Sequence, residues 1–140
     1  MVQISDSEWE VMRVVWAKGE IKSGEIIRIL KQKHQWSDST IKTLIGRLVD
    51  KKALLTQRQG RAYVYQAHLD QEAFQLASLS EVLGKVCQRQ HAQLIKGLLE
   101  ELPMTLRDVQ DLQSLLEVKK ETAVQEVPCR CLKGQCHCKQ

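Results

Sequence analysis

Apolar residues recur every three or four positions in three segments of the first fifty residues, which predicts three amphipathic helices. The first helix starts at a capping box that opens with Ser5, and it ends near Gly19. The second is expected to be capped by Ser23 and to end near His34, and the third to begin just before Asp38. The core-facing stripe of the third helix consists of Ile41, Leu44, Ile45, Leu48 and Val49.

The pattern changes to that of a β-hairpin between Leu54 and Tyr65. Two β-prone runs flank a predicted turn at Gln59–Gly60, with Tyr63 and Tyr65 on one face and Val64 on the other. Three helices followed by a hairpin are typical of a winged helix-turn-helix.

Helical spacing returns from Asp70 onward. Pro103 interrupts the pattern, and Thr105 is positioned to cap the last helix. Three short amphipathic helices scarcely cover their own apolar faces, so we expect a second copy of the chain to cover them. The apolar stripes consist of Leu76, Leu79, Leu83 and Val86; of Leu94, Ile95, Leu98, Leu99 and Leu102; and of Leu106, Val109, Leu112 and Leu116.

The predicted fold class is therefore mainly α with a small β-hairpin. We expect an N-terminal winged helix-turn-helix over 1–69 and a helical dimerisation region over 70–118. A polar linker is expected over 119–128, followed by a Cys-rich metal-binding tail over 129–140.

Charge divides the chain in the same way. Residues 1–69 contain 12 Lys and Arg against 7 Asp and Glu, a net charge of +5, whereas 70–128 contain 6 against 10, a net charge of −4. A basic front half favours a polyanionic partner for that half alone. The sequence contains no apolar run long enough for a membrane span and no signal-peptide pattern, so we expect no membrane partner and a cytoplasmic location.

The outer face of the third helix carries side chains suited to the major groove of DNA. Short polar and cationic groups reach base edges and phosphates there, and Arg58 and Arg61 beside the hairpin turn suit an adjacent phosphate or minor-groove contact. The alternative is a winged helix used for protein contacts. The candidate DNA-binding residues are Ser39, Thr40, Lys42, Thr43, Arg47, Arg58 and Arg61.

Four of the five cysteines lie within ten residues at the C-terminal end, in the pattern Cys-X-Cys-X4-Cys-X-Cys. In a cytosolic chain, crowded thiols indicate metal binding rather than disulfides, and soft thiolates in such pairs suit Cu(I) as well as Zn(II). Lys133–Gly134 allows the chain to reverse between the pairs. The alternative is a permanent zinc knuckle. The candidate metal ligands are Cys129, Cys131, Cys136 and Cys138.

The remaining reactive side chains do not suggest a second site. Cys87 is expected to be a small buried hydrophobe within a helix. His137 lies between two candidate ligands and is expected to be a bystander. The sequence shows no catalytic acid–base pair, nucleophile motif or phosphate loop, so we expect no enzyme.

Together the segments 4–12, 39–48 and 60–65 resemble the penicillinase-repressor (BlaI/MecI) family of winged-helix regulators. The Cys-X-Cys-X4-Cys-X-Cys tail resembles its copper-responsive, CopY-type branch. The resemblance implies a zinc-loaded homodimer on an inverted-repeat operator of double-stranded DNA. Cu(I) would replace Zn(II) at the tail and release the DNA, so that a copper-exporting ATPase and a copper chaperone are expressed. A copper chaperone that delivers Cu(I) is a further implied partner.

Two other functions remain open at this stage. A repressor of the same design would respond to another thiophilic metal if the four thiolates bound that ion instead. A metal-storage or carrier protein would bind metal without any effect on an operator, although the basic winged helix argues against this function.

Overall fold

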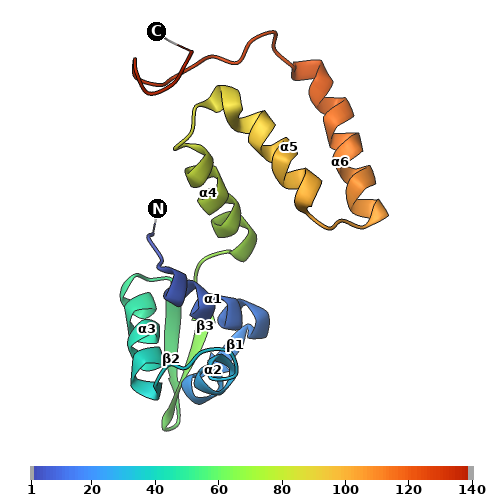
Figure 1. Ribbon diagram of the computed structural model, residues 1–140. Helices are drawn as coiled ribbons and strands as arrows, with labels where there is room; N and C mark the ends of the chain where they lie inside the picture. The colour runs from blue at the N-terminus through green and yellow to red at the C-terminus, as the bar shows by residue number, and fades with distance from the viewer. Residues whose placement is uncertain (1, 139–140) are drawn as a thin grey trace. The chain divides into compact units, whose positions relative to one another are not determined.

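The computed structural model describes residues 2–138 and divides between Leu76 and Ala77 into two compact units (Figure 1). Met1 and the last two residues of the expected tail, 139–140, lie outside the described residues. Each unit is described by itself.

The first unit contains the three predicted helices, α1 (Asp6–Lys18), α2 (Ser23–Leu30) and α3 (Asp38–Asp50). Ser5 caps α1 by accepting a hydrogen bond from the amide of Glu8, and Gly19 ends it with a φ of 80°, as predicted. Ser37 caps α3 in the same way. Ser23 does not cap α2 as expected, because it is the first helical residue and Lys22 occupies the cap without a side-chain bond.

A three-stranded antiparallel sheet completes the first unit, in the order β1 (Glu20–Lys22), β3 (Ala62–Ala67), β2 (Leu54–Gln59). The hairpin β2–β3 was predicted, but its turn lies at Gly60–Arg61, one residue later than expected, because Gln59 still pairs with Ala62. Strand β1 was not predicted. Only three residues long, it pairs with β3 across more than forty positions of sequence and buries a single side chain, Ile21.

The core of the first unit confirms the predicted stripe of α3. Ile41 and Leu48 are fully buried, and Leu44 and Ile45 nearly so. These side chains pack with buried residues of α1 and α2 and with Leu54 of β2. Because this packing fixes the inner face of α3, it also determines which side chains of α3 face solvent.

One buried ion pair joins the start of α1 to the end of α3. Lys51 Nζ lies 2.7 Å and 2.9 Å from the two carboxylate oxygens of Glu8, which is only 3% exposed. Burial by itself would raise the pKa of Glu8, but hydrogen bonds from Lys51 and Ser5 outweigh it, so the pKa lies below the ordinary value of 4.5.

Glu8→Gln is therefore expected to destabilise the first unit by about 1–3 kcal/mol at neutral pH, since it leaves Lys51 without its charged partner. A carboxylate with a lowered pKa stabilises the fold above its unfolded value and loses that contribution as pH falls through the folded pKa. Urea unfolding followed by tryptophan fluorescence should thus show the difference at pH 7 and little of it well below pH 4.5. An equal difference at both pH values would contradict this assignment.

The second unit contains the remainder of α4 (Gln71–Leu83), then η1 (Gln88–Gln90), α5 (His91–Glu101), α6 (Leu106–Lys119) and η2 (Lys120–Thr122). Thr105 caps α6 with a complete capping box to Asp108, as predicted. Helix α4 ends earlier than expected, and Val86 and Cys87 lie in the turn that follows it rather than in the helix.

The helices of the second unit expose their apolar side chains in the single chain. Neither α5 nor α6 contains a buried residue, and Phe74 is the buried residue of α4. The exposed apolar residues of α5, the following turn and α6 are Leu94, Ile95, Leu98, Leu102, Met104, Leu106, Leu115, Leu116 and Val118. Exposed large apolar side chains in such number on neighbouring helices are typical of a surface that binds a partner.

Candidate DNA-binding surface and metal centre

The outer face of α3 presents every polar residue that the sequence analysis selected on it. Ser39, Thr40, Lys42, Thr43 and Arg47 are all exposed. The hydroxyl of Thr43 donates to the carbonyl of Ser39 at 2.9 Å, which fixes its rotamer on the helix surface. An added Cβ at Gly46, on the same face, would meet nothing within 4 Å inside the chain, so this part of the helix is open.

The tip of the β2–β3 hairpin and the N-terminal end of α3 lie at the same end of the first unit (Figure 1). This follows from the chain path, because β2 begins just after α3 and runs back along it. Arg58 and Arg61 are exposed beside the tip, where Gly60 has a φ of 64°. Arg58 Nε donates to the carbonyl of Gly60 at 3.1 Å, so the guanidinium of Arg58 is held at the turn.

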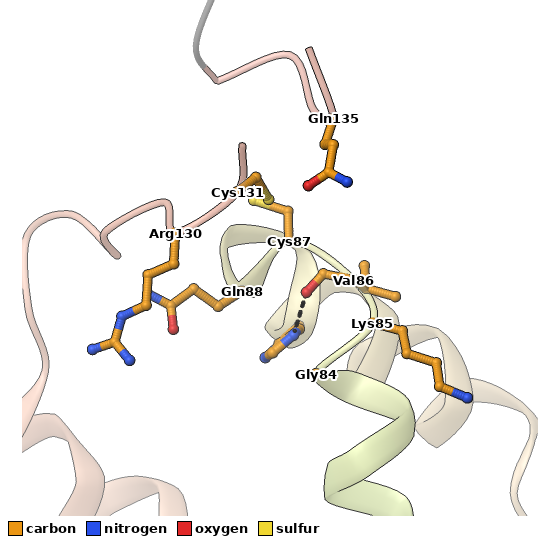
Figure 2. Close-up of a pocket in the computed structure, with 9 residues that line it drawn as sticks. Gly84, Lys85, Val86, Cys87, Gln88, Arg130, Cys131 and Gln135 are labelled. Atoms are coloured by element: carbon orange, nitrogen blue, oxygen red, sulfur yellow. Dashed lines mark hydrogen bonds between the residues drawn. The ribbon is translucent and has the colours of Figure 1, made fainter. Parts of the chain in front are cut away.

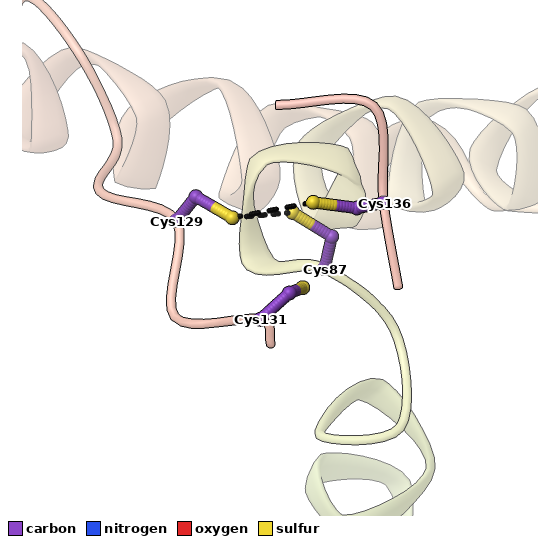
Figure 3. Close-up of side chains that lie close together, drawn as sticks. All are labelled: Cys87, Cys129, Cys131 and Cys136. Carbon is purple, nitrogen blue, oxygen red and sulfur yellow. Dashed lines mark hydrogen bonds between the residues drawn. The ribbon is translucent and has the colours of Figure 1, made fainter. Parts of the chain in front are cut away.

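Four sulfurs gather in the second unit, and Figure 3 shows their side chains pointing toward one another. The Sγ atoms of Cys87, Cys129, Cys131 and Cys136 all lie within 4.8 Å of one another. Cys129 Sγ is 3.8 Å from Cys87 Sγ and 3.4 Å from Cys136 Sγ. Cys87 is buried, and the other three are half-buried.

Cys138, the fourth candidate ligand of the tail, lies at the edge of this group. Its Sγ is 3.9 Å from that of Cys87, and its side chain is exposed. The four-sulfur group therefore contains three of the four predicted ligands, together with Cys87.

A turn between the two cysteine pairs brings the tail back on itself, as Lys133–Gly134 predicted. The amide of Gln135 donates to the carbonyl of Leu132 at 3.0 Å, and Gly134 has a φ of 94°. A residue with a side chain would be strained in this conformation, whereas glycine adopts it freely. The turn thus allows Cys136 to approach Cys129 across seven positions.

Cys87 belongs to the turn between α4 and η1, beside an open cleft of about 560 Å³ (Figure 2). Within the cleft, His91 Nε2 lies 2.6 Å from the carbonyl of Leu83 and 3.0 Å from that of Val86. Because it faces two carbonyl oxygens, this nitrogen has to be the N–H donor of the ring. It therefore donates to carbonyls at and just after the C-terminal end of α4 and has no lone pair for a metal. The lining residues are Gly84, Lys85, Val86, Cys87, Gln88, His91, Arg130, Cys131 and Gln135.

Backbone amides favour the thiolate form at two of the five cysteines. The amide of Cys138 lowers the pKa of Cys136 to about 6, and the amide of Arg89 lowers the pKa of Cys87 although burial opposes it. The hydrogen bond with Cys87 raises the pKa of Cys131 to about 12, and burial raises the pKa of Cys138 to about 11, so both of these groups favour the protonated thiol. A metal bound here would therefore displace protons from the cluster.

The donor set fits a thiophilic metal. Zinc bound tetrahedrally by four sulfurs at about 2.3 Å places those sulfurs about 3.8 Å apart. The sulfur of Cys129 lies 3.4 Å from that of Cys136 and 3.8 Å from that of Cys87, close to that spacing. Thiolates are also the ligands that Cu(I) prefers. The sulfurs of Cys87, Cys129, Cys131 and Cys136 could therefore hold a thiophilic metal ion.

Sequence reasoning missed Cys87 and Arg89. Cys87 is buried as expected, but its neighbours are sulfurs of the tail rather than a hydrophobic core. Arg89 brings a guanidinium group to the cluster, where it contacts Cys138. The same guanidinium forms an ion pair with the Glu126 carboxylate at 2.6 Å. The one available signal was the odd fifth cysteine in a chain whose other four form a metal motif.

A family model described as Penicillinase repressor matches residues 4–118 of the chain. The chain belongs to this family. It is thus a member of a family of DNA-binding transcriptional repressors, and its first unit is the winged helix of that family. The cysteine tail lies beyond the matched residues.

The chain is similar to the following proteins and solved structure. An uncharacterised 16.5 kDa protein of Latilactobacillus sakei is 40% identical over 139 residues, which cover 99% of this chain and 94% of that protein. The penicillinase repressor of Bacillus licheniformis is 30% identical over 118 residues, which cover 84% of this chain and 92% of that protein. A solved structure described as the CopR repressor is 43% identical over 49% of this chain and 99% of that chain, with a TM-score of 0.43.

Within residues 2–138, no helix has the length and apolar character needed to cross a membrane.

Proposed function

We propose that this repressor is copper-responsive. It binds an inverted-repeat operator as a zinc-loaded homodimer in the cytoplasm, and replacement of Zn(II) by Cu(I) at the cysteine cluster releases the DNA and derepresses copper-export genes. The observation that supports the proposal is the group of four thiols in a repressor of the penicillinase family, three of which belong to a tail beyond the residues that the family model matches.

If two Cu(I) replace one Zn(II) at the four thiolates, the two metal forms differ in shape rather than in charge. One Zn(II) with four thiolates has a net charge of −2, and two Cu(I) with the same four thiolates also have −2. Zn(II) favours a tetrahedral site, whereas Cu(I) favours fewer sulfurs for each ion. The two metals therefore support different arrangements of the tail, and each arrangement favours a different state of the dimer.

The homodimer is supported by the exposed apolar side chains of the second unit. Leu98 of α5 and Leu116 of α6 are each more than half exposed in the single chain. A self-complementary interface between two copies would remove this surface from water and hold two winged helices at a fixed spacing.

The proposal is tested by measuring operator affinity first with Zn(II) and then with Cu(I). Fluorescence anisotropy with DNA from the chain's own promoter is expected to show tight binding with Zn(II) and weaker binding once Cu(I) is added. Cd(II) and Ag(I) provide matched arms: release by one of these and not by Cu(I) would assign the repressor to another metal. Metal binding without any effect on DNA would instead indicate storage or transport. In a further arm, Cu(I) is supplied by a copper chaperone instead of as the free ion, and the same release of DNA is expected.

Within the winged helix, α3 and the hairpin are expected to contribute differently. Lys42→Ala and Thr43→Ala should change operator preference, by about 1–3 kcal/mol where a base contact is lost. Arg58→Ala and Arg61→Ala should weaken binding to all sequences and reduce its salt dependence, because phosphate contacts release counterions. Affinities for operator and unrelated DNA at two salt concentrations separate these effects. Unchanged binding by all four variants would exclude these residues from the interface.

A further inference from the structure

Local hydrogen bonds hold the backbone around Cys87 without any contribution from the tail. The amide of Val86 donates to the carbonyl of Leu83 at 3.0 Å, and the amide of Gln90 donates to the carbonyl of Cys87 at 2.9 Å. The ring of His91 contacts the carbonyls of Leu83 and Val86. The position of Cys87 in this turn is thus set by contacts among residues 83–91.

Cys87 supplies the sulfur that completes a set of four. The other members are Cys129, Cys131 and Cys136, and three sulfurs alone would leave a tetrahedral zinc site one ligand short. Cys138 is the exposed fifth thiol, 3.9 Å from Cys87. The structure therefore distributes five thiols between four mutually close positions and one outer position.

Polar contacts bring the tail to the same turn. Arg89 donates to the Glu126 carboxylate at 2.6 Å, and the Gln88 side-chain amide donates to the carbonyl of Pro128. These two residues directly follow Cys87 in the chain. The segment that precedes Cys129 is thus held beside the turn by groups other than the thiols.

We infer that Cys87 is a ligand of the zinc-loaded form, in which it binds the metal together with Cys129, Cys131 and Cys136. The inference rests on the proposed function, because it assumes that zinc binds the cluster. Its consequence is that the metal fastens the C-terminal tail to the turn between α4 and α5, while Cys138 stays accessible to an incoming metal. If all ligands came from the tail, the metal would not attach the tail to this turn.

Helix α4 connects the turn that contains Cys87 to the DNA-binding unit. Helix α4 begins in the first unit, where Phe74 packs against Trp9 and Trp16, and it ends at Leu83, four residues before Cys87. A metal that fixes Cys87 therefore acts on the segment that connects the winged helix to α5 and α6. This supplies a physical route by which the state of the tail reaches the repressor's DNA-binding part.

The test uses the full chain with one equivalent of Zn(II), the metal-free chain, and the chain with Cys129→Ser and Cys131→Ser. Each is alkylated briefly with N-ethylmaleimide, and labelling at each cysteine is read by mass spectrometry. Zinc is expected to protect Cys87 in the wild type and to leave Cys138 labelled; in the double variant, zinc should not protect Cys87. Labelling of Cys87 at the metal-free rate, with Cys138 protected, would overturn the inference.

Burial alone could protect Cys87 from N-ethylmaleimide, so zinc affinity is also measured by competition with a chelator. Cys87→Ser is expected to weaken zinc binding at least about tenfold, and the matched Cys138→Ser to change it by only about twofold. A Cys87→Ser affinity within about twofold of wild type overturns the inference and leaves the proposed function standing. If the wild type binds neither Zn(II) nor Cu(I), the proposed function itself fails.

Discussion

Replacement of Leu98 and Leu116 by Glu together is expected to dissociate the proposed homodimer and to weaken operator binding by about 10²–10⁴-fold. Both side chains are exposed in the single chain, so the charges need not disturb a monomer. They would be buried without partners in an apolar interface between two copies, which is strongly unfavourable. The large effect on DNA arises because two winged helices on one dimer bind the second half-site at a high effective concentration.

Sedimentation equilibrium and operator anisotropy measure the two consequences separately. The matched control is Gln93→Glu with Gln110→Glu, which adds the same two charges to polar positions of α5 and α6. This control should remain dimeric and bind the operator normally. A wild type that sediments as a monomer yet binds the operator with full affinity would remove the dimer from the mechanism.

Replacement of Cys129 and Cys131 by Ser is expected to abolish the copper response. In the wild type, exchange of Zn(II) for Cu(I) should lower operator affinity by about 5- to 150-fold, the usual range of coupling between two binding sites. The double variant should show no difference between the metals, since it loses two members of the four-sulfur group. It should also repress less well than the zinc-loaded wild type, because the zinc-supported state is lost.

A chain truncated after Glu126 gives the stricter comparison, because it removes all four tail cysteines and leaves Cys87 as the remaining thiol. Anisotropy with operator DNA should give one affinity for this chain, whichever metal is present. His137→Gln, a change between two of the tail cysteines, is a suitable control and should keep the wild-type response. Release of the truncated chain from DNA by Cu(I) would place the sensing site outside the tail.

The sequence by itself determined most of the winged helix, because its signals are local. Ser5 and Ser37 accept hydrogen bonds from amides three residues later, and the amide of Gly19 donates to the carbonyl of Val15. The stripe from Ile41 to Leu48 follows from the helical period alone. The same reasoning placed Thr105 at the start of α6 and predicted the reversal at Lys133–Gly134. Each of these features is fixed by neighbours along the chain.

Two features were decided by tertiary structure. Strand β1 is too short to show a period, and it exists because β3 offers it hydrogen-bonding partners from Val64 to Gln66. The sequence pattern predicts that Cys87 is an apolar position within a helix. In the folded chain, α4 ends at Leu83, and the Cys87 sulfur lies 3.8 Å from that of Cys129, 42 residues away in the sequence. Periodicity describes which side chains share a face of one element. It carries no information on which distant segment folds back onto that face, since this depends on packing and chain path, so the pattern revealed the thiol-rich tail but only the fold brought Cys87 to it.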